Sequence, residues 1–395
     1  MESNEVELAL PAELTDEIIG WISESPAPWK DLSCCSLVCK AWLPASRSHL
    51  FHSIRITLDK ATRWNDFLKS SHLTSYLRQV EIVEMRDVVY NMTYQERGDL
   101  VNKLYDLLPQ LAQLVTVATL IIDVLSWVSW EDIHIRYLCS AFRNITALEL
   151  RTGKFHDNQQ LMLLLRHFPL LERLYLVRIK AKPVETPAEE YSGSLSPALH
   201  TLKIAFRKAI LGEKDWLCKY YPLVGVRHLE LYDILPSEVA SAGHLMRHLQ
   251  DHLLVLGLSF DLGVDTAIIP EHFQPRHNPN LRDVRLKITL DALFPSFWDW
   301  MCHFLSSISS SLRRLSIEIN AGIDILLGAD WSLLARALDG PQFSVLQEFH
   351  LVILPSACQN MRVAIQQLLP SIYSRGIIDV IDSESSAMIQ PLFMS

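Results

Sequence analysis

Ten copies of one short apolar pattern run along this chain, and they constrain its fold more than any other feature. The pattern is apolar-x-x-apolar-x-apolar, and successive copies mostly begin 26 to 28 residues apart. In a β-strand, residues two apart share a face, so the last two apolar positions of each copy point into a core. The residue between them points outward. The copies are Leu77/Val80/Ile82, Val117/Leu120/Ile122, Ile145/Leu148/Leu150, Leu171/Leu174/Leu176, Leu199/Leu202/Ile204, Val226/Leu229/Leu231, Leu253/Leu256/Leu258, Leu281/Val284/Leu286, Leu312/Leu315/Ile317 and Leu346/Phe349/Leu351, and Phe51/Ile54/Ile56 resembles a further copy.

Between the copies the apolar spacing changes to that of a helix, i, i+3, i+4, i+7. It is seen at Leu161, Leu164, Leu165 and Phe168, and again at Phe297, Trp300, Met301 and Phe304. A strand and a helix in about 27 residues resemble the leucine-rich repeat, whose units have 20–29 residues. The sequence therefore predicts an α/β fold, a solenoid with parallel strands inside and helices outside.

The match to that repeat is incomplete. The asparagine that usually follows the last strand leucine is present at Asn320 and mostly absent elsewhere. We therefore expect irregular repeats whose turns satisfy their backbone groups in another way. The segment from Lys182 to Ser196, which holds two prolines and paired glutamates, is interpreted as an exposed loop between repeats.

The first fifty residues predict a small module of three helices. Pro11 suits the first turn of a helix that runs to about Ser23. A second helix is expected from about Lys30 to Pro44, and a third is expected to reach Phe51. Apolar residues on several sides of such short helices imply one internal surface and one shared with a partner. Ile19, Leu32 and Cys39 are the residues expected to hold the helices together.

This stretch resembles the F-box, and especially the fungal form of that family. The resemblance rests on Leu10-Pro11-x-Glu13-Leu14, then Cys35-Ser36-Leu37-Val38-Cys39-Lys40-x-Trp42, then Leu50-Phe51. It implies docking onto the Skp-type adaptor, and through it the cullin, of a ubiquitin ligase. The residues that would contact the adaptor are Leu10, Pro11, Leu14, Ile18, Leu37, Val38 and Trp42. The expected organisation is an F-box module at 8–53, a leucine-rich-repeat-like solenoid at 54–385 and a tail at 386–395.

Composition and charge exclude several other classes of protein. A net charge of −9 and a pI near 5.9 give no positive field for nucleic acid. The apolar stretch from Leu111 to Trp130 contains Asp123 and fits the repeat, so it is interpreted as soluble core, without a membrane role. The acidic N-terminus lacks the layout of a signal peptide, and the cysteines are interpreted as reduced. We therefore expect a cytoplasmic or nuclear protein.

The sequence contains no set of residues typical of an enzyme. Phosphate-binding glycine loops and nucleophile elbows are absent from it. His244, His248 and His252 would share one face of a helix, but no acidic residue or cysteine lies in phase to complete a metal site. We expect no catalytic residue, no metal and no cofactor.

The outward residues of the strands predict a binding wall on the concave face. Tyrosine and arginine are favoured at interfaces, and the middle of the solenoid brings several of them together. The predicted target-binding residues are Arg151, Arg173, Tyr175, Lys203, His228 and Tyr232. The leading hypothesis is a substrate-recognition subunit that holds a target protein for a ligase. The alternatives are a leucine-rich-repeat interaction scaffold outside any ligase and, more distantly, a metal-dependent enzyme at the histidines.

Overall fold

The computed structural model describes residues 11–383 except 24, 26–27, 71–73, 79, 87–93, 124–126, 128–131, 183–194, 207–216, 218–222, 262–263 and 290–293. The chain forms two compact units, Met1–Glu149 and Leu150–Ser395, which are described in turn. Strand β4 (Ala147–Arg151) lies across the boundary between them. Much of the predicted loop between Lys182 and Ser196, the predicted tail and Leu10 lie outside the described residues.

The first unit begins with three short helices, as the sequence predicts. They are α1 (Ala12–Ser23), α2 (Pro28–Cys35) and α3 (Trp42–His52). Ile19, Leu32 and Cys35 form the core of this module, and half-buried side chains from α1 and α3 pack against it.

Two details of that prediction are wrong. Cys39 is exposed, because α2 ends at Cys35 and the chain turns before Cys39. Pro44 does not end α2. It lies in the first turn of α3, where a missing backbone N–H breaks no helical hydrogen bond.

No linker separates the three-helix module from the first repeat. Helix α3 ends at His52 and strand β1 (Ser53–Thr57) begins at the next residue. The Phe51 ring stacks on Tyr76 with centroids 5.5 Å apart and contacts Phe67 at 6.0 Å. Phe51 therefore belongs to the module and to the first repeat, as its place in both patterns predicts.

The remaining elements of the first unit alternate between strands and helices. Strands β1, β2 (Ile82–Arg86) and β3 (Thr119–Asp123) pair in parallel in that order. The helices are η1 (Leu58–Lys60), α4 (Ala61–Leu68), α5 (Thr74–Leu77), α6 (Tyr94–Leu111) and α7 (Asp132–Ala141).

The register predicted for β2 is wrong by three residues. Val83, and not Val80, pairs with Ile54, and Met85 pairs with Ile56. The true copy is Val80/Val83/Met85, each with no exposed surface. The error arose because Leu77 and Ile82 are also apolar and give the same spacing. As a consequence Glu84, and not Glu81, is the residue between the two core positions.

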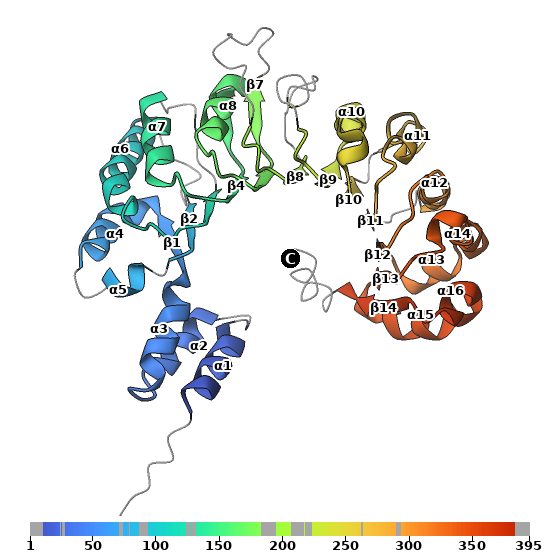
Figure 1. Ribbon diagram of the computed structural model, residues 1–395, viewed down its shortest axis with the longest axis horizontal. Coiled ribbons are helices and arrows are strands. Elements are labelled where there is room, and N and C mark those ends of the chain that lie inside the picture. The colour runs from blue at the N-terminus through green and yellow to red at the C-terminus, as the bar shows by residue number, and fades with distance from the viewer. Residues whose placement is uncertain are drawn as a thin grey trace, which may run out of the picture. The chain divides into compact units, whose positions relative to one another are not determined.

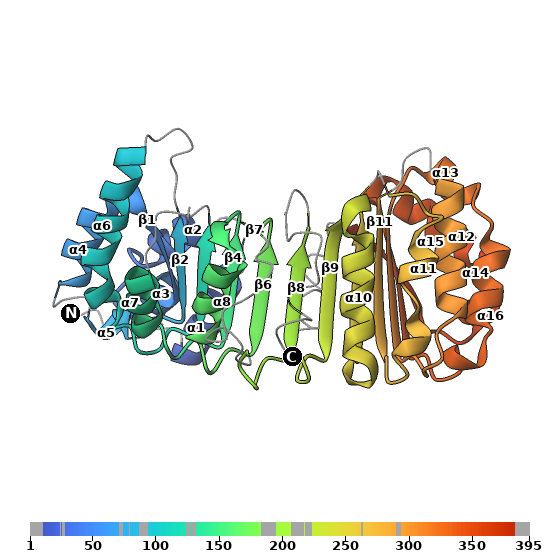
Figure 2. The ribbon, with the colours of Figure 1, turned by 90° about the horizontal axis from the view of Figure 1, so that it is seen from above.

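The second unit repeats the strand–helix layout, with strands on one side and helices covering the other (Figure 1, Figure 2). Its strands pair in parallel in the order β6 (Arg173–Val177), β8 (Thr201–Ala205), β9 (His228–Ile234), β10 (Val255–Phe260), β11 (Asp283–Thr289), β12 (Arg314–Asn320), β13 (Glu348–Ile353) and β14 (Ile378–Asp382). Strands β5 (Lys154–Asp157) and β7 (Lys180–Lys182) form a separate small sheet.

The helices of this unit carry the apolar stripes that the sequence predicts. Leu161, Leu164, Leu165 and Phe168 have no exposed surface. The helical elements are α8 (Asn158–Arg166), η5 (Pro236–Glu238), α10 (Val239–Leu249), η6 (Gln250–His252), α11 (Ile269–His272), η7 (Pro275–His277), α12 (Phe294–Ser306), α13 (Ile323–Leu327), α14 (Trp331–Leu338), η8 (Pro341–Phe343), α15 (Pro355–Leu368) and α16 (Pro370–Ser374). The predicted leucine-rich-repeat-like architecture is confirmed.

A ladder of backbone hydrogen bonds links neighbouring strands at the point where each strand begins. The Arg227 carbonyl accepts hydrogen bonds from the N–H groups of Leu254 and Val255, at 2.8 and 3.0 Å. The Leu254 carbonyl in turn accepts from Arg282 and Asp283, at 2.8 and 3.1 Å. The same fork recurs in this unit at the carbonyls of Glu172, His200, Arg282 and Arg313. It ties each strand to the next just before the strand begins, which fixes the register.

Strand β14 was missed by the sequence pattern, because its first consensus position is Arg375. The guanidinium of Arg375 donates hydrogen bonds to the carbonyls of Phe343, Ser344 and Leu346, at 3.0 to 3.3 Å. At this position, hydrogen bonds from a polar side chain therefore hold the repeat to its neighbour, where elsewhere the burial of a leucine does so. No helix among the described residues is long and apolar enough to cross a membrane.

Candidate interaction surfaces

The three-helix module carries a set of large apolar side chains, here called the docking face: the exposed Leu14, Trp21, Trp29, Leu37 and Val38, and the half-buried Ile18. On α1, Leu14, Ile18 and Trp21 follow one another at i, i+4 and i+7, whereas Ile19 lies on the opposite, buried side. Leu37 and Val38, in the turn after α2, are 85% and 63% exposed. The module's own core is complete without these residues.

The other predicted adaptor contacts are placed differently. Pro11 is exposed just before α1. Trp42 is half-buried and packs against the module core beside Ile22, Ala45 and Leu50. Trp21 and Trp29, 66% and 49% exposed, were not singled out from the sequence. The position of Trp21 three residues after Ile18 was a signal that could have identified it.

The second unit holds a cluster of charged side chains around one carboxylate, here called the Glu230 cluster. Glu230 lies between two core residues of β9 and has no exposed surface. Its carboxylate lies 2.8 Å from Lys203 Nζ, 2.6 Å from His228 Nε2 and 3.2 Å from Arg285 Nη1. The Tyr232 hydroxyl also donates a hydrogen bond to it.

Gly257 makes room for this arrangement. In register, Lys203, Glu230, Gly257 and Arg285 are successive neighbours on β8, β9, β10 and β11. A Cβ atom at Gly257 would lie 2.9 Å from Glu230 Cγ. The Glu230 side chain therefore lies over the glycine, and Arg285 reaches the carboxylate across a full strand. Nothing else in the sequence of β10 accounts for a glycine at position 257.

The charge state of the cluster follows from its contacts. Burial raises the pKa of Glu230, but the hydrogen bond from His228 and the charge of Lys203 outweigh burial and lower it to about 2. Burial and the Glu230 charge raise the pKa of Tyr232 far above its usual range. Glu230 is therefore ionised and Tyr232 is a neutral hydrogen-bond donor at neutral pH.

Four of the six predicted wall residues belong to the Glu230 cluster. Tyr175 joins it because Lys203 Nζ lies 5.1 Å above its ring centroid. Arg173 is in register with Thr201 and His228, at the start of the same strands, and Arg151 ends β4. Glu230 itself was missed as a site residue, since an outward strand position predicts a solvated side chain and this one is fully buried.

The predicted row of His244, His248 and His252 on one helix face does not form. His252 lies in η6, beyond α10, and Gln250 turns the chain with φ at 41°. The rings of His244 and His248 have centroids 6.5 Å apart. Among the described residues, no group of histidine, cysteine, aspartate and glutamate side chains has the geometry to hold a metal ion.

Comparisons with known proteins add little to this picture. No protein-family model matches the chain, and no curated protein matches it. Among solved structures, it is similar to a protein from Bacteroides fragilis at 14% identity and a TM-score of 0.40, covering 82% of this chain and 81% of that one. It is similar to the leucine-rich repeat-containing protein LegL7 from Legionella pneumophila at 13% identity and a TM-score of 0.37, covering 75% and 94%.

The yeast Rad7 and Elc1 complex also contains a chain similar to this one. The identity is 11% and the TM-score 0.34, with 95% of this chain and 94% of that chain covered. Likenesses of this degree carry no argument about function, so the functional argument rests on the surfaces described above.

Proposed function

We propose that this chain is the substrate-recognition subunit of a Skp-adaptor/cullin/F-box ubiquitin ligase. The F-box module would bind the adaptor through Leu10, Pro11, Leu14, Ile18, Leu37, Val38 and Trp42, and the strand wall of the repeats would bind a target protein. The chain would work in the cytoplasm or nucleus and carry no catalytic residue. Its contribution to ubiquitin transfer would be to bring the target close to the enzyme.

The observation that carries this proposal is the docking face. Burying one large apolar side chain contributes about 1.5–3 kcal/mol, so a few of them supply a stable complex. Leu37, at 85% exposure, has no role in the module's own core. Trp21 and Trp29 add aromatic surface of the kind that often dominates binding energy. We extend the predicted contact set to these two tryptophans.

Co-purification with the Skp-type adaptor tests the proposal. Leu37→Asp combined with Val38→Asp places two charges on the docking face, and both residues are exposed enough for the module to fold. We expect the double variant to lose the adaptor. The matched control is Val363→Asp on α15, where the parent side chain is 72% exposed. A double variant that retains the adaptor, or a parent chain that never binds it, refutes the proposal.

A second candidate is an interaction scaffold that uses the repeats outside any ligase. The Glu230 cluster favours it as much as the first, because a fixed, polar strand face suits either role. The two differ in one measurement. A scaffold without ligase function would show no ubiquitin transfer to its bound target when adaptor, cullin and conjugating enzymes are supplied together.

A further inference from the structure

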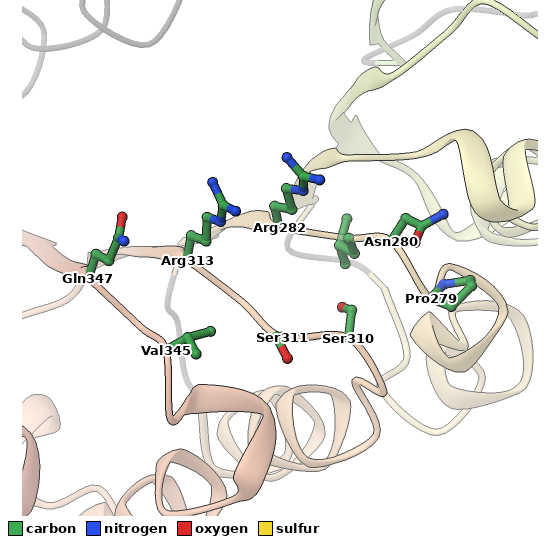
Figure 3. A pocket seen from close by; sticks show the side chains of 9 residues that line it. Pro279, Asn280, Arg282, Ser310, Ser311, Arg313, Val345 and Gln347 are labelled. Carbon is green, nitrogen blue, oxygen red and sulfur yellow. The ribbon is translucent and has the colours of Figure 1, made fainter.

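A pocket of about 600 Å³ opens in the second unit where the chain enters β11, β12 and β13. Arg282 and Arg313 stand immediately before β11 and β12, and Gln347 stands immediately before β13. Figure 3 shows the two arginine side chains projecting side by side, with Ser310 and Ser311 on the loop before β12. None of the described residues that line the pocket is acidic, and they also include Pro279, Asn280, Leu281 and Val345.

Within the described part of the chain, the two arginines lack the ion-pair partners that the neighbouring cations have. On the adjacent wall Lys287 contacts Glu318 at 2.6 Å, and Arg314 lies 4.0 Å from Asp283 and 3.9 Å from Glu348. Arg282 and Arg313 are both exposed and have no ion pair within the part of the chain that the structure describes. Neighbouring strands lie about 4.8 Å apart, and like charges on adjacent strands repel. An anion bound between the two guanidinium groups would attract both of them and so offset their repulsion.

A second observation points independently to a ligand. Ser310 is 5% exposed, and its Oγ has no hydrogen-bond partner among the residues that the structure describes. Figure 3 shows Ser310 on the loop that lies across from the segment carrying the two arginines. Buried polar groups are nearly always satisfied, so an unpartnered hydroxyl in a pocket indicates a group that a ligand would supply. The Asn280 side chain is held in place by a hydrogen bond of 2.8 Å to the Asp251 carbonyl.

We propose that this pocket binds a phosphate monoester. The exposed guanidinium groups form a rim that suits the phosphate oxygens, since arginine binds phosphate through paired charge-assisted hydrogen bonds. The buried Ser310 hydroxyl forms a floor that suits a polar group on the esterified part of the ligand. Inorganic phosphate fills only the rim, so an ester binds more tightly than the free ion. The proposal stands apart from adaptor docking, which involves the first unit.

Calorimetric titration of the full chain at low ionic strength tests this. The probes are a phosphoserine peptide, free O-phospho-L-serine, a hexose phosphate and inorganic phosphate. At least one ester is expected to bind more tightly than about 1 mM and more tightly than inorganic phosphate. The preference between peptide and hexose phosphate identifies whether the ester belongs to a protein or a metabolite. No saturable binding of any ester overturns the proposal.

Variants locate the site. Arg282→Gln and Arg313→Gln are each expected to weaken ester binding about tenfold or more, and together to abolish it. Ser310→Ala is expected to weaken ester binding while leaving the weaker binding of inorganic phosphate unchanged. Arg227→Gln is the matched control, an exposed arginine at the same point before β9, separated from Arg282 by Leu254. If the arginine double variant binds like the parent chain, the site is elsewhere and the assignment fails.

Discussion

At the scale of single residues, Glu230 shows how a repeat protein keeps a charge in its interior. The carboxylate has no exposed surface, yet three cationic or ionisable groups and a phenol contact it. Loss of one partner from a buried pair is costly, because the remaining charge is left without compensation. The cluster is therefore expected to hold four neighbouring strands in one arrangement.

The pH dependence of stability follows from this residue. The pKa of Glu230 falls from 4.5 to about 2 on folding, so its contribution is complete above pH 4.5 and is lost as pH falls toward 2. A pKa difference of that size between the unfolded and folded chain corresponds to roughly 3 kcal/mol in the free energy of unfolding. We expect Glu230→Gln to destabilise the chain most near neutral pH, with the gap from the parent narrowing below pH 4.5. Urea unfolding at several pH values measures it.

The control for that series is Glu348→Gln. Glu348 is an exposed carboxylate 3.9 Å from Arg314, and an exposed pair of this kind contributes about 0–1 kcal/mol. A gap between Glu230→Gln and the parent that stays constant down to pH 2 would show that the buried charge does not titrate as described.

Glu238 gives the stability of the chain a pH dependence of the opposite sign. This residue of η5 is 8% exposed, and burial raises its pKa to about 7 from 4.5. The folded chain then holds a proton that the unfolded chain releases, so stability falls as pH rises from about 4.5 to about 7. We expect Glu238→Gln to stabilise the chain by roughly 1–3 kcal/mol at pH 8 and to have little effect at pH 4. Thermal unfolding at the two pH values decides this, and equal effects at both would contradict it.

At the scale of elements, the contact between β9 and β10 depends on a missing side chain. We expect Gly257→Ala to destabilise the chain by about 1–3 kcal/mol, because the new Cβ would overlap Glu230 Cγ and the cluster would have to move. Gly20→Ala on α1 is the comparison, since nothing lies within 4 Å of its added methyl and alanine is the better helix former. Chemical unfolding should therefore show a lower free energy of unfolding for Gly257→Ala and a higher one for Gly20→Ala.

The last strand depends on one arginine. Arg375→Ala removes three hydrogen bonds to the chain before β13, and we expect the amides of β14 to exchange with solvent faster than those of β12. Hydrogen exchange measured by mass spectrometry reads both strands in one sample. Arg375→Leu restores the apolar consensus but removes the same three side-chain hydrogen bonds, so it should not rescue β14. Rescue by leucine would show that burial alone holds this strand.

These elements also show what the sequence could and could not reveal. Alternation of apolar residues predicts the strands because burial on one face is a property of residues two apart. The same rule misplaced β2, where two apolar alternatives compete, and missed β14, where Arg375 replaces the apolar residue. It placed Lys203, His228 and Tyr232 on one wall but not around a common partner. That partner is Glu230, whose side chain fits over β10 because Gly257 has no side chain. A glycine in a strand sequence carries no such signal until the strands are placed in register.

At the scale of the whole molecule, the chain carries two kinds of surface that differ in chemistry and belong to different units. The docking face is apolar and consists of helices and a turn in the first unit. The Glu230 cluster and the phosphate-ester pocket are polar and belong to strands and strand-preceding loops in the second unit. The function proposed above requires such a division, because binding of a target must not displace the adaptor.

This division predicts that the two binding events are energetically independent. We expect Leu37→Asp with Val38→Asp to abolish adaptor binding while leaving phosphate-ester affinity within about twofold, because the effects of residues that share no partners are usually additive. Arg282→Gln with Arg313→Gln should do the reverse. Calorimetry of each variant with each ligand completes the cycle. A change in adaptor affinity of more than about tenfold on saturation with the ester would instead reveal coupling between the sites, since any such effect must be reciprocal.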